Sequence, residues 1–239
     1  METRKFGSIY ENGQVMEPGF LISSPPDFSL GDTVPGKELQ WVELKTGLLI
    51  ADRCACRNIS WLSLNNKGFI FGKCVRIDGR DYICRSLKVG KKDGGPNEWD
   101  DALNECGEDD PLWHWNEQFF WGQEKPVRAS RRETLRMCRG WSAARGASQH
   151  YHAGAGKSHG FRPALEPLCS DSLEVLVGSN IKVFGPGGEG FEGELVDFDG
   201  YDLTLVCNTT VPQRCEWAIR RGKNAILSRD AVVGVRKIG

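Results

Sequence analysis

The chain has 239 residues, enough for one or two domains with a buried core. Its 31 Lys and Arg residues balance 32 Asp and Glu residues, so net charge does not draw it to nucleic acid or to an anionic membrane. A hydrophobic content of 39% excludes a wholly disordered chain, and no stretch reaches the roughly 18 apolar residues of a membrane span. Because the start also lacks a signal-peptide pattern, we expect a cytoplasmic protein with no membrane partner.

The N-terminal third is expected to begin irregularly and to continue as strands. We expect residues 1–40 to form an irregular lead-in, because "SSPPDFSLGDTVPG" is rich in proline, glycine and serine. Residues 47–89 contain several strand-like runs, and Asp78-Gly79 predicts a type I′ hairpin within "CVRIDGRDYICR". After it, "NEWDDALNEC" predicts a short helix that Asn97 caps and that buries Trp99.

An aromatic segment, "EDDPLWHWNEQFFWGQE", follows this helix. Aromatic rings give large, rigid surfaces for stacking on bases or packing on sugars and peptides. Trp113, His114 and Trp115 alternate, so a strand-like backbone would bury one side of them and expose the other, and they are the first candidates for a ligand surface. For Phe119, Phe120 and Trp121 a core role is the alternative.

Metal sites and cofactors are not expected. The nine cysteines are an odd number in mostly apolar settings, so we expect buried free thiols rather than disulfides. Cys54-Ala55-Cys56 has one intervening residue where structural zinc sites have two to four. His150 and His152 form a His-x-His pair, but no third ligand is in view.

The stretch "HAGAGKSHGFRPAL" looks like a phosphate-binding P-loop but lacks its pattern. Tyr151 stands where the P-loop requires its first glycine, and Pro163 prevents the helix that should follow. Nucleotide hydrolysis is therefore not predicted.

Residues 139–162 instead carry a family resemblance. The frame of Arg139-Gly140-Trp141, an irregular middle with Ala144-Arg145, and Gly160-Phe161-Arg162 resembles the C-type-lectin-fold domains of the formylglycine-generating-enzyme (sulfatase-modifying factor) type and of phage variable proteins. "NEWDDAL" resembles the Glu-Trp helix of these domains. The resemblance implies a C-type-lectin-like domain over residues 41–170, in which Arg139, Gly140, Gly160, Phe161 and Arg162 are structural.

This resemblance also bears on function. The copper-binding cysteines of the oxidase members would lie between Trp141 and Gly160, where this chain has no cysteine, so we expect no enzyme and no catalytic residue. The family then implies a rigid scaffold with a variable surface and a phage or prophage origin, in the cytoplasm of a bacterial host or in the virion. The expected ligand-contacting residues, besides those of the aromatic segment, are Trp141, Arg145, His150, Tyr151, His152 and Lys157.

The C-terminal segment, residues 176–239, reads as a small barrel. Gly185, Gly187 and Gly190 have dinucleotide-site spacing, but strand-like alternation follows them, so they predict a hairpin turn. Leu195, Phe198-Asp199, Leu203 and Leu205 are similar to the first motif of Sm-like barrels. Such barrels assemble through edge strands, so we expect a homo-oligomer; balanced charge makes RNA a less favoured partner.

The sequence therefore predicts an α+β, β-rich protein with a C-type-lectin-like domain followed by an Sm-like (SH3-like) barrel. Its expected function is non-enzymatic binding of a glycan, a protein receptor or a small molecule. One alternative is a phage anti-defence protein that sequesters a cyclic or linear nucleotide signal, and a second is an Sm-like RNA-binding protein.

Overall fold

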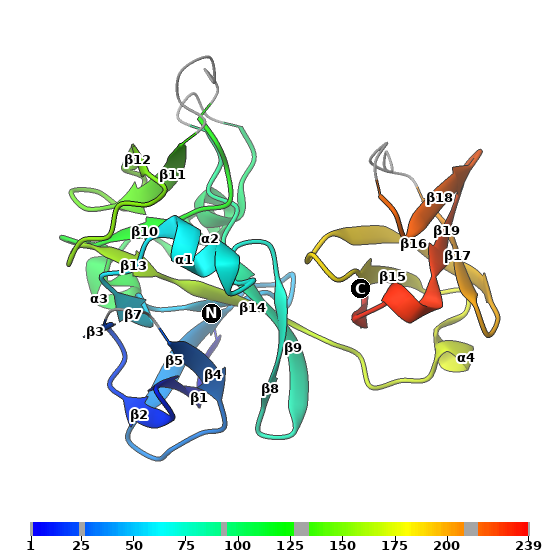
Figure 1. Cartoon of the computed structure of the whole chain (residues 1–239), viewed down its shortest axis with the longest axis horizontal. Coiled ribbons are helices and arrows are strands. Elements are labelled where there is room, and N and C mark those ends of the chain that lie inside the picture. Colours follow the sequence, from blue (N-terminus) through cyan, green and yellow to red (C-terminus); the bar gives the residue numbers. More distant parts are fainter. Residues whose placement is uncertain (1, 24–26, 92–94, 127–133, 208–214, 239) are drawn as a thin grey trace. The chain divides into compact units, whose positions relative to one another are not determined.

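The computed structural model describes residues 2–23, 27–91, 95–126, 134–207 and 215–238. The chain forms two compact units, Met1–Glu166 (unit 1) and Pro167–Gly239 (unit 2). Figure 1 shows their strands and helices. No helix in the described ranges is long and apolar enough to cross a membrane.

Unit 1 contains two sheets. The first has eight strands in the order β2-β1-β5-β6-β14-β9-β8, with β4 paired to β1. Its strands are β1 (Glu2–Glu11), β2 (Gln14–Met16), β4 (Phe28–Gly31), β5 (Glu38–Glu43), β6 (Leu49–Ala51), β8 (Lys73–Ile77), β9 (Arg80–Ser86) and β14 (Pro163–Pro167).

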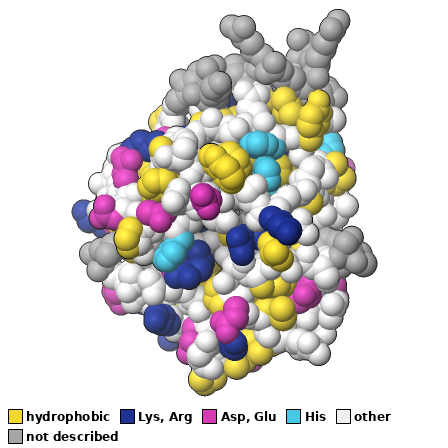
Figure 2. All heavy atoms as spheres, turned by 90° about the vertical axis from the view of Figure 1, so that its left-hand side faces the viewer, with side chains coloured by type: hydrophobic (Ala, Val, Ile, Leu, Met, Phe, Trp, Pro, Cys, Tyr) yellow, Lys and Arg dark blue, Asp and Glu magenta, His cyan; other side chains and the backbone are white. Residues whose placement is uncertain are grey.

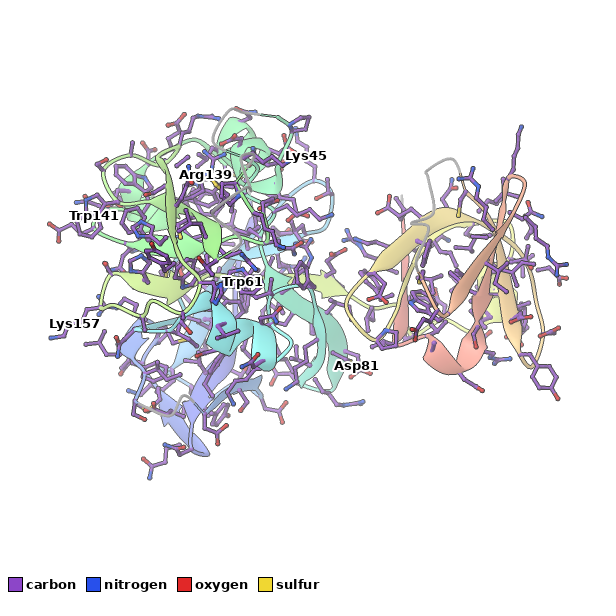
Figure 3. The ribbon with its side chains drawn as sticks, turned by 45° about the horizontal axis from the view of Figure 1, so that its top comes forward. Lys45, Trp61, Asp81, Arg139, Trp141 and Lys157 are labelled. Atoms are coloured by element: carbon purple, nitrogen blue, oxygen red, sulfur yellow. The ribbon has the colours of Figure 1, made fainter. Side chains whose placement is uncertain are left out.

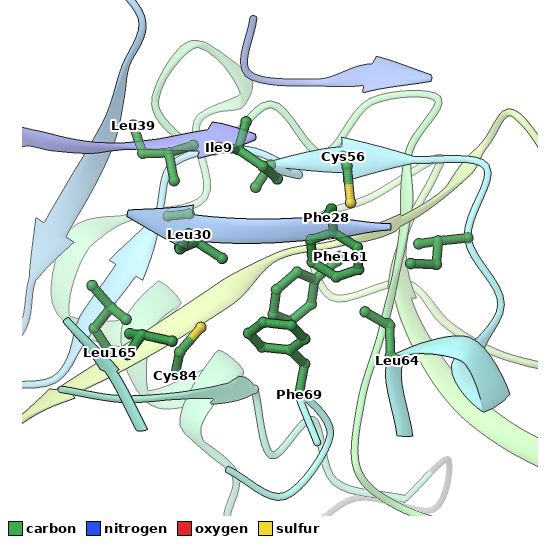
Figure 4. Packing of buried hydrophobic residues seen from close by; sticks show 14 of the residues in the cluster. Ile9, Phe28, Leu30, Leu39, Cys56, Leu64, Phe69, Cys84, Phe161 and Leu165 are labelled. Atoms are coloured by element: carbon green, nitrogen blue, oxygen red, sulfur yellow. The ribbon is translucent and has the colours of Figure 1, made fainter. Parts of the chain in front are cut away.

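The second sheet of unit 1 has six strands in the order β12-β11-β10-β13-β7-β3. Its strands are β3 (Phe20–Leu21), β7 (Cys56–Arg57), β10 (Phe119–Trp121), β11 (Leu135–Gly140), β12 (Ala147–Tyr151) and β13 (His159–Phe161). Figure 4 shows part of the core of unit 1, where the ring of Phe69 lies 5.0 Å from that of Phe28 and 5.4 Å from that of Phe161 between centroids.

Unit 2 is a six-stranded antiparallel sheet in the order β18-β19-β17-β16-β15-β20. Leu195, Leu203 and Leu205 lie in its own hydrophobic core. The strands are β15 (Asn180–Phe184), β16 (Gly190–Phe198), β17 (Asp202–Val206), β18 (Ala218–Arg221), β19 (Asn224–Ser228) and β20 (Gly234–Lys237).

The helices are short. They are α1 (Trp61–Asn66), α2 (Glu98–Cys106), α3 (Asp110–Trp113), α4 (Leu173–Leu176) and the 3₁₀ turn η1 (Arg229–Ala231). The structure is about 46% strand and 12% helix, with a curled half-barrel sheet among its three sheets. The expected fold class, α+β with a C-type-lectin fold, is therefore wrong. The prediction rested on short motifs, Arg139-Gly140-Trp141 and Gly160-Phe161-Arg162, which occupy only the ends of β11 and β13 and do not determine how the sheets are arranged.

The expected irregular lead-in over residues 1–40 is corrected as well. The ten-residue strand β1 pairs with β2, β4 and β5, so this region builds one end of the first sheet. The register of β1 with β5 shifts between Phe6 and Ser8, where Gly7 has a φ of +66°. This bulge interrupts the alternation of β1, which hides the strand from a period-two pattern.

Three local predictions are confirmed. Ile77 pairs with Arg80, and the intervening Asp78 and Gly79 have φ values of +50° and +78°, as a type I′ turn requires. Asn97 caps α2 by accepting a hydrogen bond from the Asp100 amide, and Trp99 is fully buried. The glycines near 187 lie in a hairpin, because β15 pairs with β16 from Phe184 to Gly190.

Candidate functional site

The candidate site lies on one face of the second sheet, where aromatic side chains from three strands meet. On β10, Phe119 lies opposite Gly140 of β11, and Trp121 lies opposite Cys138. Cross-strand partners share a face of the sheet, and Gly140 and Cys138 are small, so this face of β11 has space for larger rings from the neighbouring strands. The ring of His150, on β12, comes within 4.7 Å of the Phe119 ring between centroids.

A second histidine closes this cluster from the other side. His159 of β13 pairs with Phe119 in parallel register, and their ring centroids are 5.3 Å apart. The centroids of the His150 and His159 rings are 4.5 Å apart, with the planes at 76°. Trp121 lies beneath, 5.1 Å from the His159 ring between centroids.

Trp141 is the exposed member of the cluster. Its indole stacks on the Phe119 ring with a centroid distance of 5.1 Å and an interplanar angle of 9°, yet the residue keeps 43% of its surface exposed. We call Phe119, Trp141, His150 and His159 the ring cluster. Figure 3 shows Trp141 pointing away from the body of unit 1, on the same side as Lys157.

The backbone holds Trp141 in an unusual conformation. Its φ is +83°, in the left-handed region that costs a side chain of this size about 1–3 kcal/mol. The amide of Trp141 donates to the carbonyls of Trp115 and Gln118, each at 3.0 Å, and its carbonyl accepts from the Glu117 amide at 2.9 Å. Gly140 precedes it with a φ of +99°, and a Cβ there would lie 2.2 Å from the Gln118 carbonyl oxygen. The indole is thus presented from a fixed turn.

The two histidines of the ring cluster are neutral at pH 7. Desolvation lowers the pKa of His159 to about 4, and the neighbouring His150 adds to this effect. Desolvation also lowers the pKa of His150. The Nε2 atoms of both rings are buried and have no hydrogen-bond partner in the part of the chain that the structure describes. Buried polar atoms in proteins are usually paired, so these two need an explanation.

Other predicted ligand residues lie elsewhere. Trp113 is fully buried against Trp99, so the expectation that it contacts a ligand is corrected. The Trp115 indole donates to the Glu108 carbonyl at 2.8 Å. The Arg145 guanidinium donates to the Glu108 carboxylate at 2.6 Å. These contacts bind the aromatic segment to the loops around it and keep Trp115 and Arg145 out of the ring cluster.

The remaining predicted residues flank the cluster. Tyr151 is 69% exposed, and Lys157 is also exposed. The amide of His152 donates to the Thr134 carbonyl at 2.6 Å, which places His152 where β12 ends. Of the residues predicted to contact a ligand, the structure brings together Trp141 and His150.

The residues expected to be structural are mostly buried. Arg139 is 4% exposed and donates to the Val89 carbonyl at 2.8 and 2.6 Å. A Cβ on Gly160 would lie 2.8 Å from the Cys56 carbonyl oxygen, so β13 and β7 can approach this closely only with glycine there. Phe161 belongs to the core.

Arg162 is fully buried and binds main-chain oxygens. It donates to the carbonyls of Ala51 at 3.0 Å, Asp52 at 2.8 Å and Trp113 at 2.5 Å. Its guanidinium carbon lies 4.7 Å from the centroid of the Phe120 ring. Arg162 therefore ties the end of β6 to the aromatic segment beside the ring cluster.

His114 belongs to a second polar group next to this anchor. Its φ of +43° places it in the left-handed region just after α3. The His114 Nε2 lies 3.0 Å from the Arg53 Nη2, and its Nδ1 lies 3.5 Å from the buried Asp52 carboxylate. His114 is thus separate from the histidines of the ring cluster.

Sequence reasoning missed Phe119, His159 and Arg53. Phe119 was considered for the core, yet alternation along β10 places Phe119 and Phe120 on opposite faces of the strand. His159 directly precedes the Gly160-Phe161-Arg162 motif, and that position was its available signal. The parallel pairing of β10 with β13, which brings His159 to Phe119, has no local sequence signal.

Cysteines and metal ligands give no further site. Cys54, Cys56, Cys84, Cys138 and Cys207 are buried and free, whereas Cys74 is exposed. Across the described residues, no group of three or more His, Cys, Asp or Glu side chains is placed to hold a metal ion.

Comparison with known proteins adds no relative. No protein-family model matches the chain, and neither a curated protein nor a solved structure matches it.

Proposed function

We propose that unit 1 is a non-enzymatic binding module that stacks a flat, ring-bearing ligand on the exposed face of Trp141. The observation that carries the proposal is the conformation of this residue. A large apolar side chain is held outward, at a strained φ, by three backbone hydrogen bonds, and Phe119 supports its inner face. Strained backbone concentrates at ligand sites because the structure must keep the side chain where the ligand needs it.

The two neutral histidines favour binding over chemistry. A general base works best when its pKa is near the working pH, whereas the pKa of His159 is about 4. The neutral imidazoles instead add ring surface to a largely aromatic site, which offers a ring ligand apolar contact. Nucleobases are the ring class that fits best, since base–aromatic stacking tolerates any base.

The proposal is tested by titrating the full-length protein with adenosine, guanosine and a methyl glycoside, using isothermal calorimetry. We expect the nucleosides to bind and the glycoside, which lacks a flat ring, to bind weakly. Trp141→Gly removes the indole and suits a φ of +83°, so this variant keeps the turn. Since stacking contributes about 1–3 kcal/mol per base, Trp141→Gly should weaken nucleoside binding by about tenfold or more.

Tyr151→Ala is the matched control, because Tyr151 is an exposed aromatic residue of the same hairpin and lies outside the ring cluster. It should bind nucleosides like the wild type. Nucleoside affinities that are equal in wild type and Trp141→Gly would contradict the proposal, as would a wild-type protein that binds no ring compound.

A further inference from the structure

Arg53 is an exposed cation with part of its hydrogen-bonding capacity unused. Its Nε and Nη2 donate to the Asp52 carboxylate at 3.0 and 2.8 Å. Nη2 also lies 3.0 Å from the His114 Nε2, which must accept because a guanidinium only donates. Nη1 has no acceptor among the described residues, and the Arg53 side chain is 40% exposed.

The surroundings hold this guanidinium in place. Asp52 is 1% exposed, so its carboxylate is a fixed partner rather than a mobile surface group. His114 occupies the left-handed position after α3, where glycine or asparagine is usual, and there its ring reaches both Arg53 and Asp52. Arg162 donates to the carbonyls of Asp52 and Trp113, which fixes the backbone on both sides.

The charges around Arg53 balance rather than repel an anion. The carboxylates of Asp52 and Asp110 offset the guanidinium groups of Arg53 and the buried Arg162. The Asp110 Oδ1 is already engaged, because it accepts from the Asn116 amide at 2.7 Å. The free Nη1 is therefore the outward end of a preorganised arginine, the group that best recognises carboxylate and phosphate oxygens.

His114, which contacts this cation, lies near Trp141 along the backbone. His114 precedes Trp115, whose carbonyl accepts from the Trp141 amide at 3.0 Å. The path from the His114 Cα through the Trp115 carbonyl and this hydrogen bond to the Trp141 Cα adds up to about 11 Å with standard backbone dimensions, which is the largest possible distance between the two Cα atoms. Figure 2 shows one face of the molecule on which histidine side chains lie beside both hydrophobic and Lys or Arg side chains.

We infer that the ligand stacked on Trp141 carries an oxyanion, a phosphate or a carboxylate, and that Arg53 Nη1 donates hydrogen bonds to it. This inference rests on the proposed function, since it assigns a second contact to the same ligand. The ring provides stacking on Trp141, and Arg53 selects the charged compound over its uncharged counterpart.

The test compares pairs of compounds that differ in the anionic group. Adenosine and adenosine 5′-monophosphate test phosphate, whereas indole and indole-3-acetate test carboxylate, all by calorimetry on the full-length protein. We expect one charged member to bind about tenfold or more tightly than its partner, and its affinity to fall with added salt. Which pair shows the difference identifies the oxyanion.

Variants assign the effect to Arg53. Arg53→Met should reduce the affinity for the charged member to that for the uncharged one, without changing the latter. Because this variant leaves Asp52 buried without its arginine, the double variant Asp52→Asn/Arg53→Met gives the same comparison with the buried charge removed. Arg76→Met is the control, since Arg76 is an exposed arginine of unit 1 that also pairs with an aspartate.

The outcomes separate the two proposals. If charged and uncharged members bind equally, and Trp141→Gly weakens both, stacking stands and the anion contact is overturned. If the charged member is preferred but Arg53→Met and the double variant keep that preference, Arg53 is not the contact. If no compound binds, the proposed function fails and the inference fails with it.

Discussion

The neutral state of His159 makes the stability of unit 1 depend on pH. Its pKa is lowered from 6.5 to about 4 in the folded protein, chiefly by desolvation. The unfolded chain therefore binds more protons than the folded one between these values, and stability is lost as the pH falls from about 6.5 towards 4. From pH 7 to pH 5, the two pKa values give a loss of about 2 kcal/mol, which solvent screening of the partly exposed ring reduces to about 1 kcal/mol.

The assay is urea unfolding at pH 7 and pH 5, followed by near-ultraviolet circular dichroism. This signal reports mainly on unit 1, which holds every tryptophan except Trp217. In His159→Gln, the difference in the free energy of unfolding between the two pH values should be smaller than in the wild type by about 1 kcal/mol. His152→Gln serves as the control. Equal pH dependence in wild type and His159→Gln would refute the assignment of the acid sensitivity to this ring.

Two further predictions concern the scaffold. Arg162→Met leaves buried carbonyl oxygens unpaired, so we expect it to lower the free energy of unfolding by about 3 kcal/mol or more. Arg145→Met removes only exposed ion pairs and should lower it by at most about 1 kcal/mol. Urea unfolding measures both values, and similar losses in the two variants would argue against Arg162 as an anchor. Gly140→Ala places a Cβ against the Gln118 carbonyl in a residue with a positive φ, so thermal unfolding should show that the free energy of unfolding falls by about 3 kcal/mol or more. Gly79→Ala also has a positive φ, but its Cβ would have no atom within 4 Å, so the expected loss is about 1 kcal/mol. Equal effects of the two alanines would contradict the steric explanation.

The sequence predicted features that depend on neighbouring residues. The Asp78-Gly79 turn and the Asn97 cap follow from the conformational preferences of a few residues, and both are present. Trp141 and His150 both lie against Phe119, and the β11–β12 hairpin that brings them there is local in sequence. Short-range preferences of this kind need no knowledge of the fold.

Features that depend on distant pairing were missed. β1 is built by pairing with β4 and β5, across a bulge that breaks its alternation. The ring cluster requires β13 to lie beside β10 in parallel, which no turn signal encodes. Trp113 was assigned to a ligand surface on the assumption of a strand-like backbone, but it lies in α3 and packs inward against Trp99. In each case tertiary pairing decided the outcome.

The contacts of Arg162 have a consequence for how this protein can diversify. Arg162 recognises the main-chain oxygens of Ala51, Asp52 and Trp113, not their side chains. A cation that binds backbone places no chemical requirement on the residue types it holds. Packing still constrains Ala51, Asp52 and Trp113, which are buried. The partly exposed residues that follow them, Arg53 and His114, can change and alter the chemistry of the surface, while Arg162 keeps the two segments in register.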